Sequence, residues 1–185
     1  MLRYTGNPFV DAGITVLKLR LGKRVEDFTI EDLEREAKAI EQEYTKKNWK
    51  GYLTVHFTSN SGWTNPTIGA EKKAAYVNLV LRGYRRSPEV GPSCAFCGRP
   101  GQAIVNRVHV PLLTGETIMV AGAEGAPGLA VCGYCLFAVQ FYPLAALKVD
   151  GRPLFWAVAN PEWNRRLSLQ FYNDVTRIAR PEILS

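Results

Sequence analysis

Four cysteines in two closely spaced pairs carry the most specific chemistry in this sequence of 185 residues. Two residues separate Cys94 from Cys97, and two separate Cys132 from Cys135. Two such pairs supply the four thiolates that a closed tetrahedral zinc site requires. A glycine stands beside each pair and lets the backbone bend so that both sulfurs can face one ion. The spacing therefore predicts a structural zinc ion held by all four cysteines.

Two other uses of paired cysteines are open. Disulfides suit a secreted protein, but segment 1–8 has no charged and then apolar export signal, which favours the reducing cytoplasm. A redox-active pair normally occurs once, at the start of a helix after a strand, so a thiol oxidoreductase fits two pairs poorly. The stretch between the pairs, 98–131, is longer than in common zinc ribbons, which leaves the fold of this lobe open.

The sequence has no signature of catalysis. Its only histidines are His56 and His109, and neither lies in a local pattern that would make a nucleophile or a general base. A P-loop, a dinucleotide-binding glycine pattern and a metalloprotease helix motif are all missing. We expect both histidines to be satisfied structural residues, with His109 outside a metal shell that four cysteines already fill. The sequence indicates a protein that is not an enzyme.

A polar, turn-forming segment at 58–67 is the best candidate for a binding loop. Asn60, Ser61 and Asn65 offer short donors and acceptors for base edges or phosphates, and Trp63 offers a plane for stacking or wedging. The alternative is that the asparagines only make turn hydrogen bonds and that Trp63 caps the core. The cations expected to meet DNA phosphates are Lys72, Lys73, Arg82, Arg85 and Arg86.

Charge is unevenly distributed along the chain. The net charge is +6, and a moderately basic protein without an export signal commonly meets nucleic acid. Residues 26–43 are strongly acidic, whereas basic residues gather between 72 and 107 and between 165 and 180. We expect the acidic segment to be a helix whose charged face is merely solvated. The remaining surface would then be more basic than the total charge indicates.

Helix and strand signals occur without regular βαβ alternation, which favours an α+β fold of mixed helices and short strands with a zinc-stapled lobe. Caps and apolar spacing predict helices over 8–21, 30–44, 70–83 and 161–178. Strands are predicted at 52–57, 104–110 and 117–120, a loop begins at 122, and a hairpin covers 147–158. Three regions are expected: 1–90 with the binding loop, 91–136 with the cysteine pairs, and 137–185, whose hairpin and last helix pack on the first region.

The run 129–147 carries no charge and approaches the length of a membrane span. It also contains two cysteines, Gln140 and Pro143, and glycines and a proline precede it. A buried helix after the second cysteine pair is therefore the better interpretation, and no membrane partner is expected.

Three features together resemble a known family. They are the segment 4–13 (Tyr-Thr-Gly-Asn-Pro-Phe-Val-Asp-Ala-Gly), the polar loop 57–66 (Phe-Thr-Ser-Asn-Ser-Gly-Trp-Thr-Asn-Pro), and the two cysteine pairs in that order. This combination resembles the CxxC-CxxC family of CRISPR-associated proteins, the large subunits of type I, chiefly I-B, Cascade surveillance complexes. The family's usual chain is longer and has a helical C-terminal region that this sequence lacks.

The resemblance implies a non-catalytic subunit that recognises the protospacer-adjacent motif in double-stranded DNA and helps to start R-loop formation beside the 5′ end of the guide RNA (crRNA). It also implies partners: the Cascade backbone and repeat-end-binding subunits, and downstream a helicase-nuclease or a transposon targeting factor. In such systems the guide reads sequence by pairing, while the protein reads only a short duplex motif. A different reading of the same residues is a stand-alone structural zinc module that binds RNA or protein through its basic face.

Overall fold

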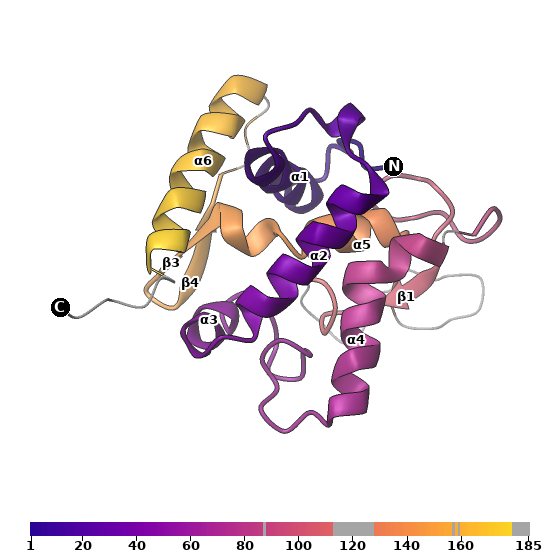
Figure 1. Ribbon diagram of the computed structural model, residues 1–185, viewed down its shortest axis with the longest axis horizontal. Coiled ribbons are helices and arrows are strands. Elements are labelled where there is room, and N and C mark those ends of the chain that lie inside the picture. The colour runs from indigo at the N-terminus through magenta and orange to yellow at the C-terminus, as the bar shows by residue number, and fades with distance from the viewer. Residues whose placement is uncertain (87, 113–127, 157, 159, 179–185) are drawn as a thin grey trace.

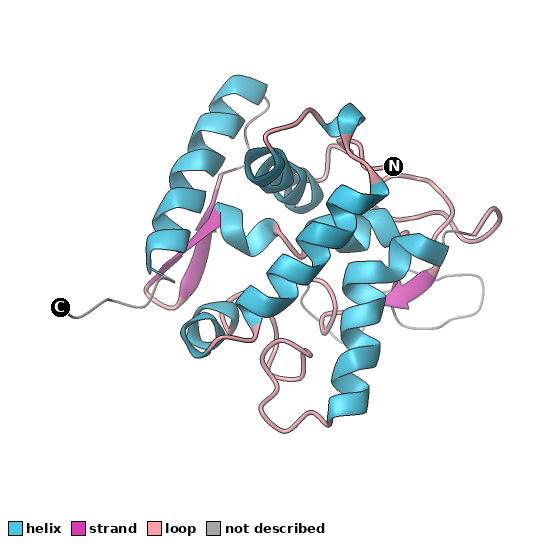
Figure 2. Cartoon of the chain, in the orientation of Figure 1, coloured by secondary structure: helices cyan, strands magenta, loops and turns pink. Residues whose placement is uncertain are grey.

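Helices and two small two-stranded antiparallel sheets give this chain a mixed α+β architecture in a computed structural model (Figures 1 and 2). The structure describes residues 1–86, 88–112, 128–156, 158 and 160–178. Its antiparallel pairs are β1 (Ala103–Val105) with β2 (Leu129–Val131), and β3 (Ala146–Val149) with β4 (Arg152–Phe155). The α-helices within the described residues are α1 (Pro8–Leu21), α2 (Ile30–Tyr44), α3 (Lys47–Leu53), α4 (Ala70–Arg82), α5 (Gly133–Val139) and α6 (Pro161–Ile178).

Local capping signals fix the ends of the long helices. The Asn7 side chain accepts hydrogen bonds from the backbone N–H groups of Phe9 and Val10 at the start of α1, and Gly22 ends that helix in the left-handed conformation. Thr29 and Asp32 form a reciprocal capping box at the start of α2. The helices predicted over 8–21, 30–44, 70–83 and 161–178 are thus confirmed to within a residue.

Helix α5 lies at the centre of the core, packed between α1 and α4 (Figure 1). Leu136, Phe137, Ala138 and Val139 have no exposed surface. A Cβ atom at Gly13 of α1 would lie 1.9 Å from the Ala138 carbonyl oxygen, so the two helices approach at a distance that only glycine permits. The last glycine of the segment 4–13 therefore sets the crossing of α1 and α5.

The strand predicted at 52–57 is wrong, because residues 47–53 form α3 and residues 54–56 form a turn. Trp49 and Leu53 are buried four residues apart, which is the spacing of one helix face. The apparent alternation of Leu53, Val55 and Phe57 combines the end of this helix with the turn after it. Burial of one helix face outweighed the strand propensity of the segment.

The second half of the chain confirms some strand predictions and shortens others. The strand expected at 104–110 is limited to Ala103–Val105, because the Asn106 side chain accepts the N–H of Val108 and starts a turn. The hairpin at 147–158 is confirmed, although β4 ends at Phe155; its turn residues Asp150 and Gly151 both have positive φ, as a type I′ turn requires. The strand predicted at 117–120 and the loop from 122 lie outside the described residues.

The run 129–147 forms β2, α5 and a short 3-10 helix (Tyr142–Ala145), and it is largely buried. The expected buried helix after the second cysteine pair is therefore confirmed. Within the described ranges, no helix combines the length and the apolar character that crossing a membrane demands.

The sequence indicated that the charged face of α2 is merely solvated, and this expectation is wrong. Arg20 of α1 is mostly buried and forms ion pairs with Glu36 and Glu43. Asp32 pairs with Lys23 at 2.7 Å and with Arg35 at 2.9 Å. These carboxylates instead attach α2 to its neighbours.

His56 is buried as expected, but its hydrogen-bonding capacity is not satisfied. Its ring lies 4.9 Å from the Tyr52 ring and 5.5 Å from the Tyr142 ring, between centroids, and neither ring nitrogen has a hydrogen-bond partner among the described residues. Burial lowers the pKa of His56 to about 3. The imidazole is therefore neutral in the folded protein near neutral pH.

Replacing Gly13 with alanine should destabilise the fold by at least about 2 kcal/mol, because the new methyl group collides with a backbone carbonyl that cannot rotate away. The control is Gly51→Ala in α3, where a Cβ meets no atom within 4 Å. Alanine there should raise the free energy of unfolding by up to about 1 kcal/mol, because it favours a helix more than glycine does. Urea unfolding of both variants tests this. Equal effects of the two substitutions would contradict the proposed helix crossing.

Buried His56 predicts acid sensitivity. The unfolded chain binds a proton at His56 with a pKa near 6.5, whereas the folded chain does so only near pH 3, so stability falls as the pH drops below about 6.5. Between pH 7.5 and 5.5 this residue should account for a loss of about 1.4 kcal/mol. Denaturant unfolding of the wild type and of His56→Phe at both pH values isolates the effect, and an identical pH dependence in the two proteins would refute it.

Candidate metal centre and nucleic-acid interface

The four cysteine sulfurs form one compact cluster. All lie within 4.8 Å of one another, and only Cys97 is more than slightly exposed. The Cys97 and Cys132 sulfurs are 3.6 Å apart, while two sulfurs at adjacent corners of a zinc tetrahedron with 2.3 Å bonds are about 3.8 Å apart. All four thiols are free. The cluster therefore has the size and the donor set of a tetrathiolate metal site.

Each cysteine pair occupies a different type of turn. After the first pair, the N–H of Gly98 donates to the Cys94 carbonyl at 2.9 Å, and the φ of 74° at Gly98 is one that glycine adopts easily. The second pair begins α5, where Cys132 is the N-cap residue and Cys135 lies in the first turn. The pairs meet because the N–H of Ala95 donates to the Ala130 carbonyl of β2 at 2.8 Å.

Hydrogen bonds between neighbouring cysteines shift the pKa values of their thiols. Hydrogen bonding from Cys132 holds the pKa of Cys94 below its usual range, while hydrogen bonding with Cys132 raises the pKa of Cys135. A soft divalent ion would stabilise all four thiolates, and sulfur-only tetrahedral sets are typical of zinc and iron. The four cysteines can hold a metal ion, and zinc is compatible with them.

Basic groups surround the cluster. The Arg99 Nε donates to the Cys97 sulfur at 3.3 Å, and an Nη of the same side chain donates to the Met1 carbonyl at 2.6 Å. Arg3 donates to the Cys97 carbonyl at 3.0 Å. These contacts attach the first residues of the chain to the metal lobe and place positive charge beside the thiolates. His109 is not part of the cluster; it stacks on Tyr76 and contacts Asn106.

Trp63 does not occupy the exposed position that DNA wedging or stacking needs. It is 4% exposed, its Nε1 donates to Gln140 Oε1 at 3.0 Å, and its ring packs edge-on against Tyr44 and Tyr76. Ser61 has no exposed surface and hydrogen-bonds the Tyr76 hydroxyl at 2.8 Å. Both residues belong to the core beneath the loop, as the alternative reading of Trp63 holds.

The two asparagines of the loop differ. Asn65 Oδ1 accepts the N–H and the hydroxyl of Thr67, both at 2.9 Å, so this residue stabilises a turn. Asn60 is exposed, and its side chain makes no hydrogen bond within the described part of the chain. Of the four loop residues predicted to contact DNA, Asn60 alone has an exposed side chain that no hydrogen bond engages.

The predicted phosphate-binding cations also divide into two groups. Arg82 pairs with Glu41 at 2.7 Å, and Arg85 forms a two-pronged ion pair with Glu34, so α2 neutralises both. Lys72 and Arg86 are exposed and Lys73 is partly exposed; none of the three has an ion pair among the described residues. Only this second group retains charge for a phosphate.

Sequence reasoning missed two sets of residues. Gln140 is the buried partner of Trp63, and its Nε2 also donates to the carbonyls of His109 and Leu136. Its position as the sole polar side chain within the apolar stretch 136–141 is a usable signal. The exposed lysines at 46, 47 and 50 were also missed, although three lysines within five residues are visible in the sequence.

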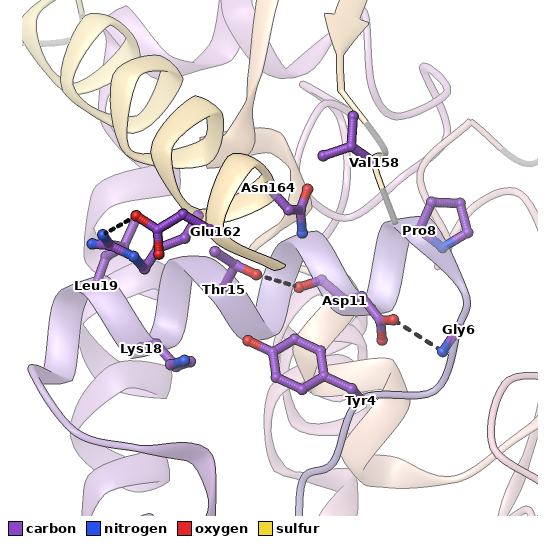
Figure 3. Close-up of a pocket in the computed structure, with 11 residues that line it drawn as sticks. Tyr4, Gly6, Pro8, Asp11, Thr15, Lys18, Leu19, Val158, Glu162 and Asn164 are labelled. Atoms are coloured by element: carbon purple, nitrogen blue, oxygen red, sulfur yellow. Dashed lines mark hydrogen bonds and ion pairs between the residues drawn. The ribbon is translucent and has the colours of Figure 1, made fainter. Parts of the chain in front are cut away.

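A groove of about 1010 Å³ lies between α1 and the start of α6 (Figure 3). Tyr4 and Lys18 line it on one side, with the ammonium 5.9 Å from the ring centroid, and Arg165 lines it on the other. Two carboxylates, Asp11 and Glu162, balance these two cations. None of the residues predicted to bind DNA lines the groove.

The Asp11 side chain holds the first residues of the segment 4–13 in place. Its carboxylate accepts the N–H of Thr5 at 2.8 Å and the Thr5 hydroxyl at 3.0 Å. It also accepts the N–H of Gly6 at 2.9 Å (Figure 3). These bonds fold the residues before α1 back onto the helix. The segment therefore builds one wall of the groove.

Comparison with protein-family models, with curated proteins and with solved structures found no match to this chain. The residues and their geometry therefore carry the functional argument.

Elemental analysis of the purified full chain should find one metal ion per molecule, bound by thiolates. Cys135→Ser should abolish this stoichiometry and destabilise the protein by several kcal/mol, because structural metal sites contribute their binding energy to folding. Ser93→Ala, an exposed neighbour of Cys94, is the control and should retain the metal. A metal content near zero in protein prepared without chelator, or equal contents in both variants, would contradict a metal centre.

Proposed function

We propose that this chain is a non-catalytic DNA-recognition subunit whose lobe is held together by a structural zinc ion and whose 58–67 loop reads a short duplex motif. The observation that carries the proposal is the exposed, unpaired Asn60 side chain on a loop whose base is anchored in the core. Lysines that lack acidic partners within the described residues follow at the start of α4.

Anchoring of the loop favours recognition. The Trp63–Gln140 hydrogen bond and the Ser61–Tyr76 hydrogen bond hold the loop from below, while Thr64 donates to the Thr58 carbonyl across it. A loop that is already ordered loses little conformational entropy on binding. Trp63 therefore supports the reading element and does not enter the DNA.

Asn60 has the chemistry of a base reader. Its amide can bond adenine in a bidentate manner in the major groove, or donate to acceptors in the minor groove. Lys72, Lys73 and Arg86 would add contacts to phosphates that do not depend on sequence. The loop has no exposed aromatic side chain to act as a wedge, so opening of the duplex would depend on pairing with the guide RNA. The RNA–DNA duplex formed in this way is about as stable as the DNA duplex that it replaces.

The resemblance to the CRISPR CxxC-CxxC family supports a specific setting for this activity. The proposal places the chain in a type I-B Cascade complex as its large subunit, next to the 5′ end of the guide RNA and in contact with the backbone and repeat-end-binding subunits. Motif recognition would license R-loop formation and then a helicase-nuclease or a transposon targeting factor. Co-purification with a small guide RNA tests this setting directly.

Duplexes randomised over a short window test motif reading. Asn60→Ala should reduce the preference for the selected motif by roughly tenfold or more, since a good base contact contributes about 1–3 kcal/mol of discrimination. Lys72→Ala should weaken binding to all duplexes alike. Asn173→Ala, an exposed asparagine on α6, is the matched control and should change neither. Binding without any motif preference in the wild type would instead favour a stand-alone zinc module.

A further inference from the structure

Four exposed lysines gather where α3 meets the β3–β4 hairpin. Lys46 is the N-cap of α3, Lys47 begins the helix, Lys50 lies in its last turn, and Lys148 belongs to β3. The Lys148 ammonium donates to the Gly51 carbonyl at 3.1 Å, which brings its charge to the α3 surface. These four residues are named the α3 lysine patch.

Within the described residues, no carboxylate forms an ion pair with the α3 lysine patch. The nearest acids in sequence do not neutralise it: Glu43 is bound to Arg20, and Asp150 is exposed in the hairpin turn. Arg82 and Arg85, which the sequence favoured, are by contrast neutralised by α2. The groove beside α1 has balanced charge. The patch is thus a concentrated excess of positive charge.

The position of the patch relates it to the 58–67 loop. Figure 1 shows α3, the segment between α3 and α4, and the start of α4 along one edge of the molecule. Along the chain, α3 with three of the four patch lysines precedes the loop, and α4 with Lys72 and Lys73 follows it. A protein segment that enters a DNA groove faces a phosphate backbone on each side, so cations on both flanks suit a duplex.

We propose that the α3 lysine patch binds the phosphate backbone of duplex DNA on the side of the 58–67 loop opposite α4. Lysine suits this task because it is a point charge on a flexible stem, which contacts phosphates without reading bases. This inference rests on the proposed function, because the duplex that the patch binds is the one that carries the motif read by the 58–67 loop. The patch extends the interface to residues that are far apart in sequence.

Binding of a short labelled duplex by the full chain across a salt series tests the patch. Lys148→Ala should reduce the slope of log affinity against log salt by about 1, and Lys46→Ala with Lys50→Ala by about 2. Motif-bearing and motif-lacking duplexes should lose affinity equally, and Lys148→Arg should restore the slope. The controls are Lys38→Ala and the pair Lys18→Ala with Lys38→Ala, which remove the same charge elsewhere and should change affinity less than twofold.

The outcomes separate this inference from the proposed function. An unchanged slope in Lys148→Ala, with motif preference still lost in Asn60→Ala, would overturn the patch alone. Equal slope changes in the patch and control variants would also overturn it, because net charge would then be the cause. Weakened binding of single-stranded RNA with duplex binding intact would overturn the duplex assignment. If the wild type bound duplexes without motif preference and Lys148→Ala still reduced the salt slope, the patch would be supported and motif reading would be contradicted.

Discussion

The burial of nearly all of α5 is the constraint on which the rest of this structure depends. A seven-residue helix with no exposed surface from Leu136 to Val139 must be enclosed by other elements on every side. α1 encloses it through the close approach at Gly13, and α4 packs on it from another side. Two of the four thiols belong to the N-cap and the first turn of α5, and its C-cap, Gln140, is the buried amide beneath the loop. The metal centre and the candidate reading loop are therefore joined to the two ends of one element.

This arrangement couples metal binding to the loop mechanically. Cys132 and Gln140 are separated by about 12 Å along the helix axis. The Gln140 side chain accepts from Trp63 and donates to the His109 carbonyl, while its backbone carbonyl accepts the Tyr44 hydroxyl. A buried amide with all these bonds is costly to displace, because each group left unpaired costs about 1–3 kcal/mol. A zinc ion would thus stabilise the loop without contacting DNA.

Charge is arranged on the surface by the same packing. Helix α2 uses its carboxylates to attach to Arg20, Arg82 and Arg85, so an apparently basic middle region is largely neutral where it meets α2. The lysines of α3 and β3 lie where no acidic helix faces them. Among the described residues, the lysines without an ion pair include three on α3 and its N-cap and two at the start of α4, the elements that precede and follow the loop in the chain.

Local signals in the sequence determined the helix caps at Asn7 and Thr29 and the turn at Asp150 and Gly151, and the two cysteine pairs indicated the cluster that the four sulfurs form. Each depends on residues within a few positions of one another, or on a ligand set that only one metal geometry satisfies. The tertiary structure alone decided the rest. It replaced a predicted strand with α3, moved Trp63 from a DNA wedge to the core, neutralised Arg82 and Arg85, and brought Lys148 to α3. The physical reason is that a side chain's exposure and charge depend on partners distant in sequence, as Gln140 is from Trp63, and only packing chooses those partners.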